Sequence, residues 1–232
     1  GVLPLIFGSV LITVLATLLA LPLSIATALF MSEISTLRIR TALKLIIEIL
    51  ASIPSVVFGF FGIVLVGPFL EHYFHVASGL NAFTAAIMLA FMSIPTITSV
   101  SEEALQAVPV NLKYASLALG ASKLQTMIRV TLPAANSGIV AGIMLGIGRA
   151  IGETMTVMMV AGGAAKITAN IFSPVRTITG TIASEMGEVI FGDQHYHALF
   201  MLGILLFFIT LGVNMLSAYI INRIKNSKKK NG

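Results

Sequence analysis

The sequence predicts an all-α protein, a polytopic transmembrane helical bundle with about five spans. Its 232 residues are 57% hydrophobic and only 10% charged, and the mean hydropathy is +1.00, whereas a soluble domain carries about 25% charged residues. A spanning helix needs about 20 mostly apolar residues, and five stretches qualify. They are Leu3–Met31, Ile53–Leu70, Ala82–Val100, Ser137–Gly162 and Ala198–Asn222. The low charge content excludes a soluble helical core, and a single transmembrane domain over residues 1–232 is expected.

The first span opens the chain. Gly1–Met31 is too long for a signal peptide and has no basic flank at its start. We therefore expect it to cross the membrane as a helix. Because the chain begins without Met inside an apolar stretch, we also expect that upstream sequence is missing.

Positive charges in the connections predict the orientation of the spans. Eleven Lys and Arg residues follow the first, third and fifth spans, whereas Lys166 and Arg176 lie on the opposite side. The positive-inside rule places the side with more Lys and Arg residues in the cytoplasm. The C-terminus is therefore expected to be cytoplasmic. The tail Lys225–Lys230 is expected to anchor this topology and to attract anionic headgroups. The net charge of +5 thus reflects membrane topology and not nucleic-acid binding.

Residues 101–135 are predicted to form a structured cytoplasmic elbow between two spans. A helix is expected over Asn111–Leu119, and Gly120 ends it. Ser122 and Gln125 form an S-x-x-Q capping box that starts a second short helix. Such an elbow is either a surface loop that joins two spans or a docking site for a partner, and its mixture of apolar and basic side chains favours docking.

The connection over residues 163–197 is predicted to lie outside the cytoplasm. A short helix is expected over Thr177–Glu188, with Ala183, Met186 and Val189 against the bundle. This connection is the natural docking surface for an extracytoplasmic partner.

Metal ligands are scarce in the sequence. The chain has no Cys, and its four His residues lie in predicted loops, without a third ligand at suitable spacing. We therefore expect no cofactor to bind this chain and the His residues to be solvated.

Arg149 and Glu153 place two opposite charges inside the otherwise apolar fourth span. Ionisable groups at mid-membrane cost about 2.5–3.5 kcal/mol each on insertion scales, so they are a functional-site hypothesis by default. At a spacing of i, i+4 the two side chains are expected on one helix face. One interpretation is an ion pair that holds the bundle together, although buried pairs contribute little to stability. The other interpretation is a binding site for an oxyanion.

The oxyanion hypothesis follows from the chemistry of both side chains. Arginine presents a planar fork that matches phosphate oxygens. Phosphate near neutral pH keeps a P–OH group that can donate to Glu153, whereas sulfate has no proton to donate, and a site whose acceptor stays unpaired rejects such an analogue. Arg149, Glu153 and Thr154 are therefore predicted to bind phosphate in preference to sulfate. Without substrate, Arg149 and Glu153 are expected to pair with each other.

The predicted elbow carries a family resemblance. Tyr114-Ala115-Ser116, then Gly120, then Val130-Thr131-Leu132-Pro133 is similar to the EAA loop of ABC importer permeases, with Tyr114 in place of the usual Glu. In that family the loop is a coupling helix that sits in a groove of an ATP-hydrolysing subunit. The resemblance implies the fold of type I ABC importer permeases. It also implies a set of ATPase-coupling residues, which are Tyr114, Ala115, Ser116, Gly120, Ala121 and Ser122.

Further stretches narrow the resemblance to phosphate importer permeases of the PstC type. They are Val57–Gly67, Ser101–Pro109, Gly148–Met155 and Glu185–Phe200, and the resemblance covers nearly the whole chain. Members of this group usually carry one more span upstream. The resemblance implies that Arg149 and Glu153 take part in phosphate translocation.

The resemblance also implies partners and location. The sequence has no G-x-x-x-x-G-K-[ST] phosphate loop, so the chain is not expected to be an enzyme, and ATP with Mg²⁺ would be used by a partner. Expected partners are a second, PstA-like permease subunit, two ATPase subunits, an extracytoplasmic phosphate-binding protein and lipids of a prokaryotic cell membrane. Two alternatives stay open. One is a permease for sulfate or molybdate, and the other is an ion-coupled carrier with Arg149 and Glu153 as a proton relay.

Overall fold

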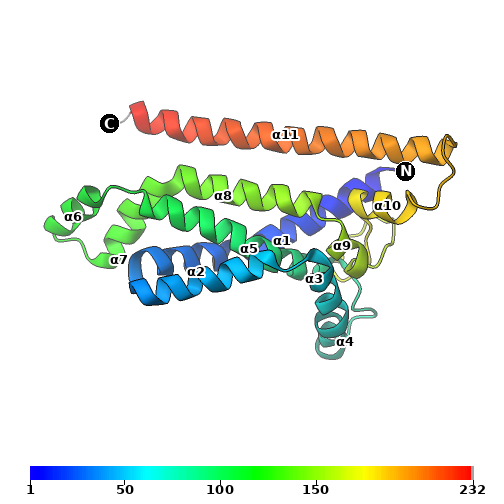
Figure 1. Ribbon diagram of the computed structural model, residues 1–232, viewed down its shortest axis with the longest axis horizontal. Helices are drawn as coiled ribbons and strands as arrows, with labels where there is room; N and C mark the ends of the chain where they lie inside the picture. Colours follow the sequence, from blue (N-terminus) through cyan, green and yellow to red (C-terminus); the bar gives the residue numbers. More distant parts are fainter. Residues whose placement is uncertain (231–232) are drawn as a thin grey trace. The chain divides into compact units, whose positions relative to one another are not determined.

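The computed structural model describes the backbone of residues 1–230 and the side chains of residues 1–224, and most of the described chain is helical (Figure 1). Within these residues five helical stretches are long and apolar enough to cross a membrane. They are Leu3–Ile34, Ser55–Phe74, Ala82–Gln106, Lys123–Gly152 and Gln194–Ile224. The predicted five spans and the all-α fold class are therefore confirmed. The side chains of the basic tail Lys225–Lys230 lie outside the described residues.

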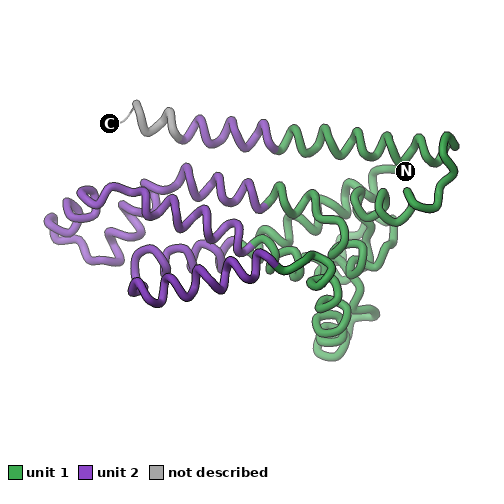
Figure 2. The backbone as a smooth tube through the Cα atoms, in the orientation of Figure 1, with its two compact units in different colours: residues 1–20, 53–93, 147–213 green, residues 21–52, 94–146, 214–232 purple. Residues whose placement is uncertain are grey.

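The chain divides into two compact units, each assembled from three separate segments (Figure 2). Unit 1 consists of Gly1–Ala20, Ile53–Ser93 and Ile147–Val213, and unit 2 consists of Leu21–Ser52, Ile94–Gly146 and Asn214–Gly232. Four long helices contribute residues to both units. They are α1 (Leu3–Leu29), α5 (Ala82–Gln106), α8 (Leu132–Gly152) and α11 (Gln194–Lys230).

Unit 2 is built where α1, α5 and α8 pack together. Its core consists of Ala28, Leu105, Val108, Ala135 and Ile139. Small residues allow these helices to approach closely, as is common between membrane helices. A Cβ atom added to Gly138 of α8 would collide with Ala104 of α5.

The shorter elements of unit 2 lie at the ends of these helices. They are the π-helical turn η1 (Phe30–Ile34), α2 (Leu37–Ser52), α6 (Val110–Ala118), α7 (Lys123–Thr126) and the π-helical turn η3 (Met127–Thr131). Helix α2 occupies the segment that the sequence predicted as a basic connection. None of its residues is buried.

A buried carboxylate in unit 2 explains one of the charges on α2. Glu102 of α5 is 1% exposed, and its Oε1 lies 2.8 Å from Nη2 of Arg40. The two atoms are at ion-pair distance, although they lack the alignment of a hydrogen bond. An ionised group out of water requires such a partner, because its desolvation is otherwise uncompensated. Arg40 therefore fixes α2 against α5.

Removing one member of this pair is expected to destabilise unit 2. In Arg40→Met the Glu102 carboxylate stays buried without its cation, which costs about 3 kcal/mol and lowers the unfolding temperature by about 6–12 °C for a chain of this size. The double variant Arg40→Met/Glu102→Met removes both charges and is expected to recover most of the loss. Thermal unfolding of the purified protein in detergent measures the difference, and equal unfolding temperatures for wild type and Arg40→Met would contradict this account.

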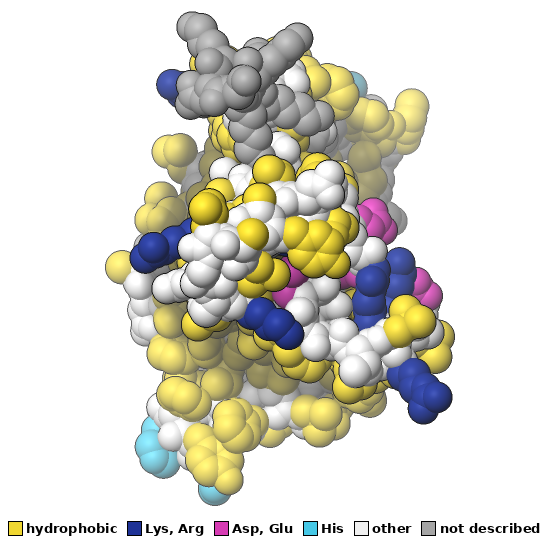
Figure 3. Space-filling view, turned by 90° about the vertical axis from the view of Figure 1, so that its left-hand side faces the viewer, with side chains coloured by type: hydrophobic (Ala, Val, Ile, Leu, Met, Phe, Trp, Pro, Cys, Tyr) yellow, Lys and Arg dark blue, Asp and Glu magenta, His cyan; other side chains and the backbone are white. Residues whose placement is uncertain are grey.

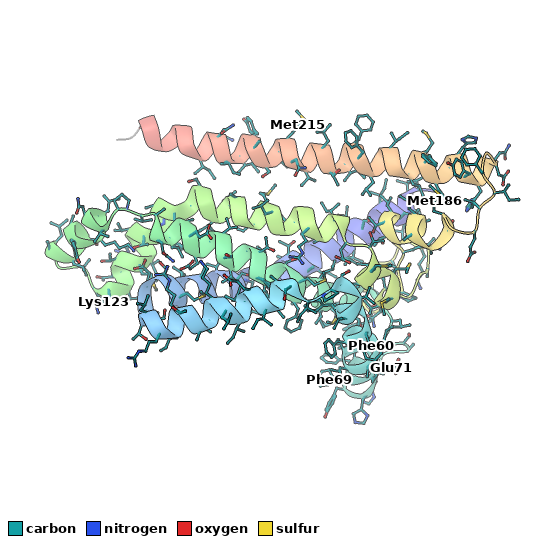
Figure 4. All side chains as sticks on the ribbon, viewed as in Figure 1. Phe60, Phe69, Glu71, Lys123, Met186 and Met215 are labelled. Carbon is teal, nitrogen blue, oxygen red and sulfur yellow. The ribbon has the colours of Figure 1, made fainter. Side chains whose placement is uncertain are left out.

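In unit 1 the second membrane span packs on a short helix from the fourth. Helix α3 (Ser55–Phe61), the π-helical turn η2 (Gly62–Val66) and α4 (Gly67–Phe74) follow one another without a break. Gly59 of α3 faces Met159, and Gly62 of η2 faces Val160, both on α9 (Met155–Val160). Phe60 and Phe69 project from α3 and α4 (Figure 4) and are more than half exposed.

Unit 1 has a core of its own, in which α10 (Ile178–Glu185) packs against α1 and α11. Helix α10 is the short helix that the sequence predicted over Thr177–Glu188. Leu5, Ile178, Leu199 and Leu202 are the buried members of this core. The expectation for Met186 and Val189 is confirmed, because both pack against this core with Ile182 (Figure 4). The expectation for Ala183 is wrong, because Ala183 is exposed. The three packed residues follow the i, i+4, i+7 spacing of one helix face, and Ala183 lies off that face.

Candidate functional site

The polar part of the fourth span lies in unit 1, where its helix breaks. Helix α8 ends at Gly152 and α9 begins at Met155, so Arg149 occupies the last turn of α8, while Glu153 and Thr154 lie between the two helices. The prediction of one continuous helix with both charges on one face is therefore wrong. Glycine is a weak helix former, and Oγ1 of Thr154 donates to the Gly152 carbonyl at 3.2 Å, which competes with helical bonding.

Glu153 is fixed from three sides at this break. Its backbone N–H donates to the Ala150 carbonyl at 3.4 Å, which closes the last turn of α8. Its own carbonyl accepts from Oγ1 of Thr179 on α10 at 2.9 Å. Its carboxylate Oε1 accepts from the backbone N–H of Thr156 at 3.3 Å, in the first turn of α9. Non-helical backbone at membrane depth needs such partners, because lipid offers none.

The two hydroxyls near Glu153 have different surroundings. Thr156 is fully buried, and its Oγ1 donates to the Ser55 carbonyl at 2.8 Å and lies 3.3 Å from the Met92 sulfur. It therefore ties α9 to the start of α3 and to α5, and it has a structural role. Thr154 is only partly buried, although its hydroxyl already donates to the Gly152 carbonyl within its own segment.

Arg149 lies on the opposite face of α8 from the side chains that pack on α1. Ile147 and Ile151 line an apolar cavity of about 200 Å³ together with Ser9 and Thr13 of α1. A residue two positions from Ile147 points about 200° away around the helix, and the Arg149 side chain is accordingly exposed. The last turn of a helix also favours a cation electrostatically. Glu153, four residues further along the chain, is half-buried.

The predicted elbow is present in unit 2 with the predicted local structure. Helix α6 ends where Gly120 adopts a φ of +84°, a left-handed conformation that suits glycine. The Ser122 hydroxyl accepts from the Gln125 N–H at 3.2 Å, and the Gln125 side chain accepts from the Ser122 N–H at 2.9 Å. This reciprocal pair is the predicted capping box. The hydroxyls of Ser116 and Thr126 lie 3.0 Å apart and connect α6 with α7.

The elbow displays apolar side chains together with cations. Tyr114 is 66% exposed and Leu119 is 89% exposed, and Ala121 is half-buried between the two helices. Lys123 projects from α7 (Figure 4), and Figure 3 shows basic side chains among apolar ones on the face of the protein that holds α6 and α7. Exposed apolar surface of this kind marks an interaction site. The exposed large apolar residues of the elbow are Val110, Leu112, Tyr114, Leu117, Leu119, Leu124 and Ile128.

One polar cluster in unit 1 was missed by the sequence reasoning. Arg176 lies before α10, and its Nη2 is 2.8 Å from Oε1 of Glu185. The other oxygen of Glu185 lies 2.9 Å from Nε2 of His195, a residue expected to be solvated in a loop but found in the first turn of α11. Charges about ten residues apart give no periodic signal, so only the fold brings them together. Among the described residues no group of His, Cys, Asp and Glu could hold a metal ion.

The described residues form membrane-length helices with a polar break after α8 and an exposed elbow, and comparison with known proteins identifies the class of protein. The family model described as "Binding-protein-dependent transport system inner membrane component" matches residues 20–226, and the chain belongs to this family. It is therefore an inner-membrane transport subunit.

Relatives place the chain more narrowly within the family. It is 35% identical over 243 residues to the phosphate transport system permease protein PstC of Mesorhizobium japonicum, which covers 97% of this chain and 74% of the relative. It is 37% identical to the probable ABC transporter permease protein YqgH of Bacillus subtilis, over 97% of this chain and 73% of the relative. An inward-facing MetNI methionine ABC transporter shares the fold, with a TM-score of 0.73 at 18% identity over 96% of this chain and 95% of that chain.

Proposed function

We propose that this chain is the membrane-spanning permease subunit of an ATP-driven phosphate importer. The observation that carries the proposal is the break between α8 and α9, because Arg149 lies in the last turn of α8 and Glu153 and Thr154 follow it directly. The similarity to proteins named phosphate transport system permeases, at 35% identity for the Mesorhizobium protein, supports phosphate as the substrate.

Arg149 and Glu153 have complementary tasks at this site. The guanidinium fork of Arg149 binds two phosphate oxygens. Among the hydrogen bonds of the described residues, the backbone engages Oε1 of Glu153, so Oε2 is the oxygen that accepts the P–OH group. Phosphate offers that proton near neutral pH and sulfate does not, which makes the carboxylate the element that discriminates between the two anions. Thr154 adds a hydroxyl beside them.

The elbow couples this chain to ATP hydrolysis on a separate subunit. Its exposed apolar surface fits a groove of an ATPase, with Tyr114, Ala115 and Ser116 on α6 and Gly120, Ala121 and Ser122 in the turn that follows. ATP and Mg²⁺ are bound by that partner. The full importer then contains a PstA-like second permease, two ATPase copies and an extracytoplasmic phosphate-binding protein docked on residues 163–197. In this arrangement the C-terminus is cytoplasmic, and the whole chain is one transmembrane domain.

Reconstitution of the complex tests the proposal. The chain is purified from membranes with the subunits that accompany it and placed in proteoliposomes with the binding protein. Radiolabelled phosphate is expected to enter only when ATP is present on the ATPase side, and a hundredfold excess of sulfate is expected to leave the rate unchanged. Uptake by this chain alone without ATP would instead establish an ion-coupled carrier, and competition by sulfate or molybdate would establish a different oxyanion as substrate.

A further inference from the structure

A largely buried ion pair joins the elbow to the end of the first membrane helix within unit 2. The ammonium Nζ of Lys113, on α6, lies 2.6 Å from Oε1 of Glu33, in the π-helical turn η1. The side chains are only 21% and 16% exposed. Ion pairs in full contact with water contribute little, but a shielded pair is weakened less by solvent and salt. The contact therefore connects two elements whose residues are 80 positions apart in the chain.

The surroundings of Glu33 hold its carboxylate in place. The Ser32 hydroxyl donates to the same Oε1 at 3.2 Å, and the Ser35 hydroxyl donates to the Met31 carbonyl at 2.8 Å, across the π-helical turn. Single π-helical turns occur frequently at functional sites. Glu33 lies in such a turn, and its carboxylate contacts Lys113 of the elbow.

The two helices of the elbow are held together by internal contacts. The contact of Ser116 with Thr126 connects its two helices, and the capping box of Ser122 and Gln125 defines the turn between them. The chain connects the elbow to α5 on one side and, through η3, to α8 on the other. The pair of Lys113 and Glu33 adds a third, non-covalent connection, which leads to α1.

We infer that the ion pair of Lys113 and Glu33, here called the strut, transmits displacement of the docked elbow to α1. The inference rests on the proposed coupling of this chain to an ATPase. Helix α1 extends from Leu3 to Leu29, with Pro22 inside it. In unit 1 the Ser9 hydroxyl of α1 accepts from the Ile178 N–H at 3.1 Å. Ser9 also lines the cavity that contains Ile147 and Ile151, the neighbours of Arg149 on α8. In unit 1, α1 thus lines a cavity together with the helix that carries Arg149. Lys113 and Glu33 are positioning residues and do not touch the substrate.

The experiment measures coupling in the reconstituted complex. Glu33→Gln and Lys113→Gln are compared with Glu33→Lys/Lys113→Glu, which reverses the pair, and with Glu48→Gln and Lys44→Gln on α2 as matched controls. The readouts are co-purification of the ATPase, the ATPase rate and the phosphate transported per ATP. Each single variant of the pair is expected to retain the ATPase and its hydrolysis but to transport about tenfold less phosphate per ATP, because neighbouring charges couple strongly. The reversed pair is expected to transport at least half as much phosphate per ATP as the wild type. The control variants are expected to match the wild type.

Four outcomes separate the possible failures. If both single variants transport as much phosphate per ATP as the wild type, the inferred role of the strut is wrong. Loss of coupling in the singles without recovery in the reversed pair also overturns it, because a strut needs only opposite charges at this distance. If the single variants fail to assemble, the phosphate transported per ATP is measured on the reversed pair alone. A value below half of the wild-type value then overturns the inference. A wild-type complex that transports phosphate without ATP would contradict the proposed function instead.

Discussion

Replacing Arg149 with Gln is expected to reduce phosphate uptake by the assembled importer at least about a hundredfold. The substitution removes a charge-assisted fork that binds two oxygens of the anion, and each such hydrogen bond contributes about 1.5–3 kcal/mol. Arg149→Lys keeps the charge but not the fork, and it is expected to give an intermediate rate because lysine acts as a point charge. Initial rates of radiolabelled phosphate uptake in proteoliposomes measure the effect.

The control for Arg149 is Arg38→Gln, which removes an exposed arginine from α2 in unit 2. It is expected to leave uptake unchanged. The ATPase and the second permease must co-purify with each variant in wild-type amounts, so that loss of uptake is not loss of assembly. Normal uptake in an assembled Arg149→Gln complex would remove Arg149 from the substrate pathway.

Glu153→Gln is expected to change which anion is transported. The Gln carbonyl can still accept from the Thr156 N–H, as Oε1 of Glu153 does at 3.3 Å, so the break between α8 and α9 is preserved. The amide N–H₂ can donate to sulfate, whereas the carboxylate repels it. Phosphate uptake is expected to fall about tenfold, and the preference for phosphate over sulfate about a hundredfold.

Competition of unlabelled sulfate with labelled phosphate measures this preference. Glu188→Gln, at an exposed position after α10, is the matched control and should keep the wild-type preference. If the Glu153→Gln importer excludes sulfate as strictly as the wild type, the carboxylate is not the discriminating group. The assignment of the P–OH acceptor would then be wrong, while the role of Arg149 would still stand on its own test.

The sequence predicts the spans and the elbow because both depend on local signals. Long apolar stretches are visible in the composition of any window, and all five appear as helices. The turn of the elbow depends on Gly120, whose φ is +84°, and on the capping box of Ser122 and Gln125. These residues lie within five positions of one another. The assignment of the elbow to an ATPase remains a prediction, as does the role of Arg149, Glu153 and Thr154 in binding substrate.

The break in the fourth span could not be predicted, because its partners are distant in the sequence. Gly152 and Thr154 weaken the helix locally, but such residues also occur within continuous membrane helices, so they do not by themselves predict a break. The carbonyl of Glu153 is satisfied by Thr179, and the buried hydroxyl of Thr156 by the carbonyl of Ser55. Only the packed fold supplies these two contacts.

The ion pairs of unit 2 also could not be predicted, because their partners are distant in the sequence. A carboxylate within an apolar helix such as α5 requires a partner, but the sequence offers many cations, and Arg40 becomes the partner of Glu102 only because α2 lies against α5. The same reasoning applies to Glu33 and Lys113. Pattern analysis finds charges that need an explanation, and the fold identifies their counterions.

The length of helix α11 affects how this helix fits into the lipid bilayer. Its apolar stretch Gln194–Ile224 is 31 residues long and hardly buried by the rest of the chain, which makes it about 46 Å long. The hydrocarbon layer of a bilayer is about 30 Å thick, so α11 must either tilt or extend into the headgroup region at its ends. Tyr196 and Tyr219 are about 35 Å apart along the helix axis, and tyrosine is enriched where a helix meets the membrane surface. A thinner bilayer is therefore expected to increase the tilt of this helix.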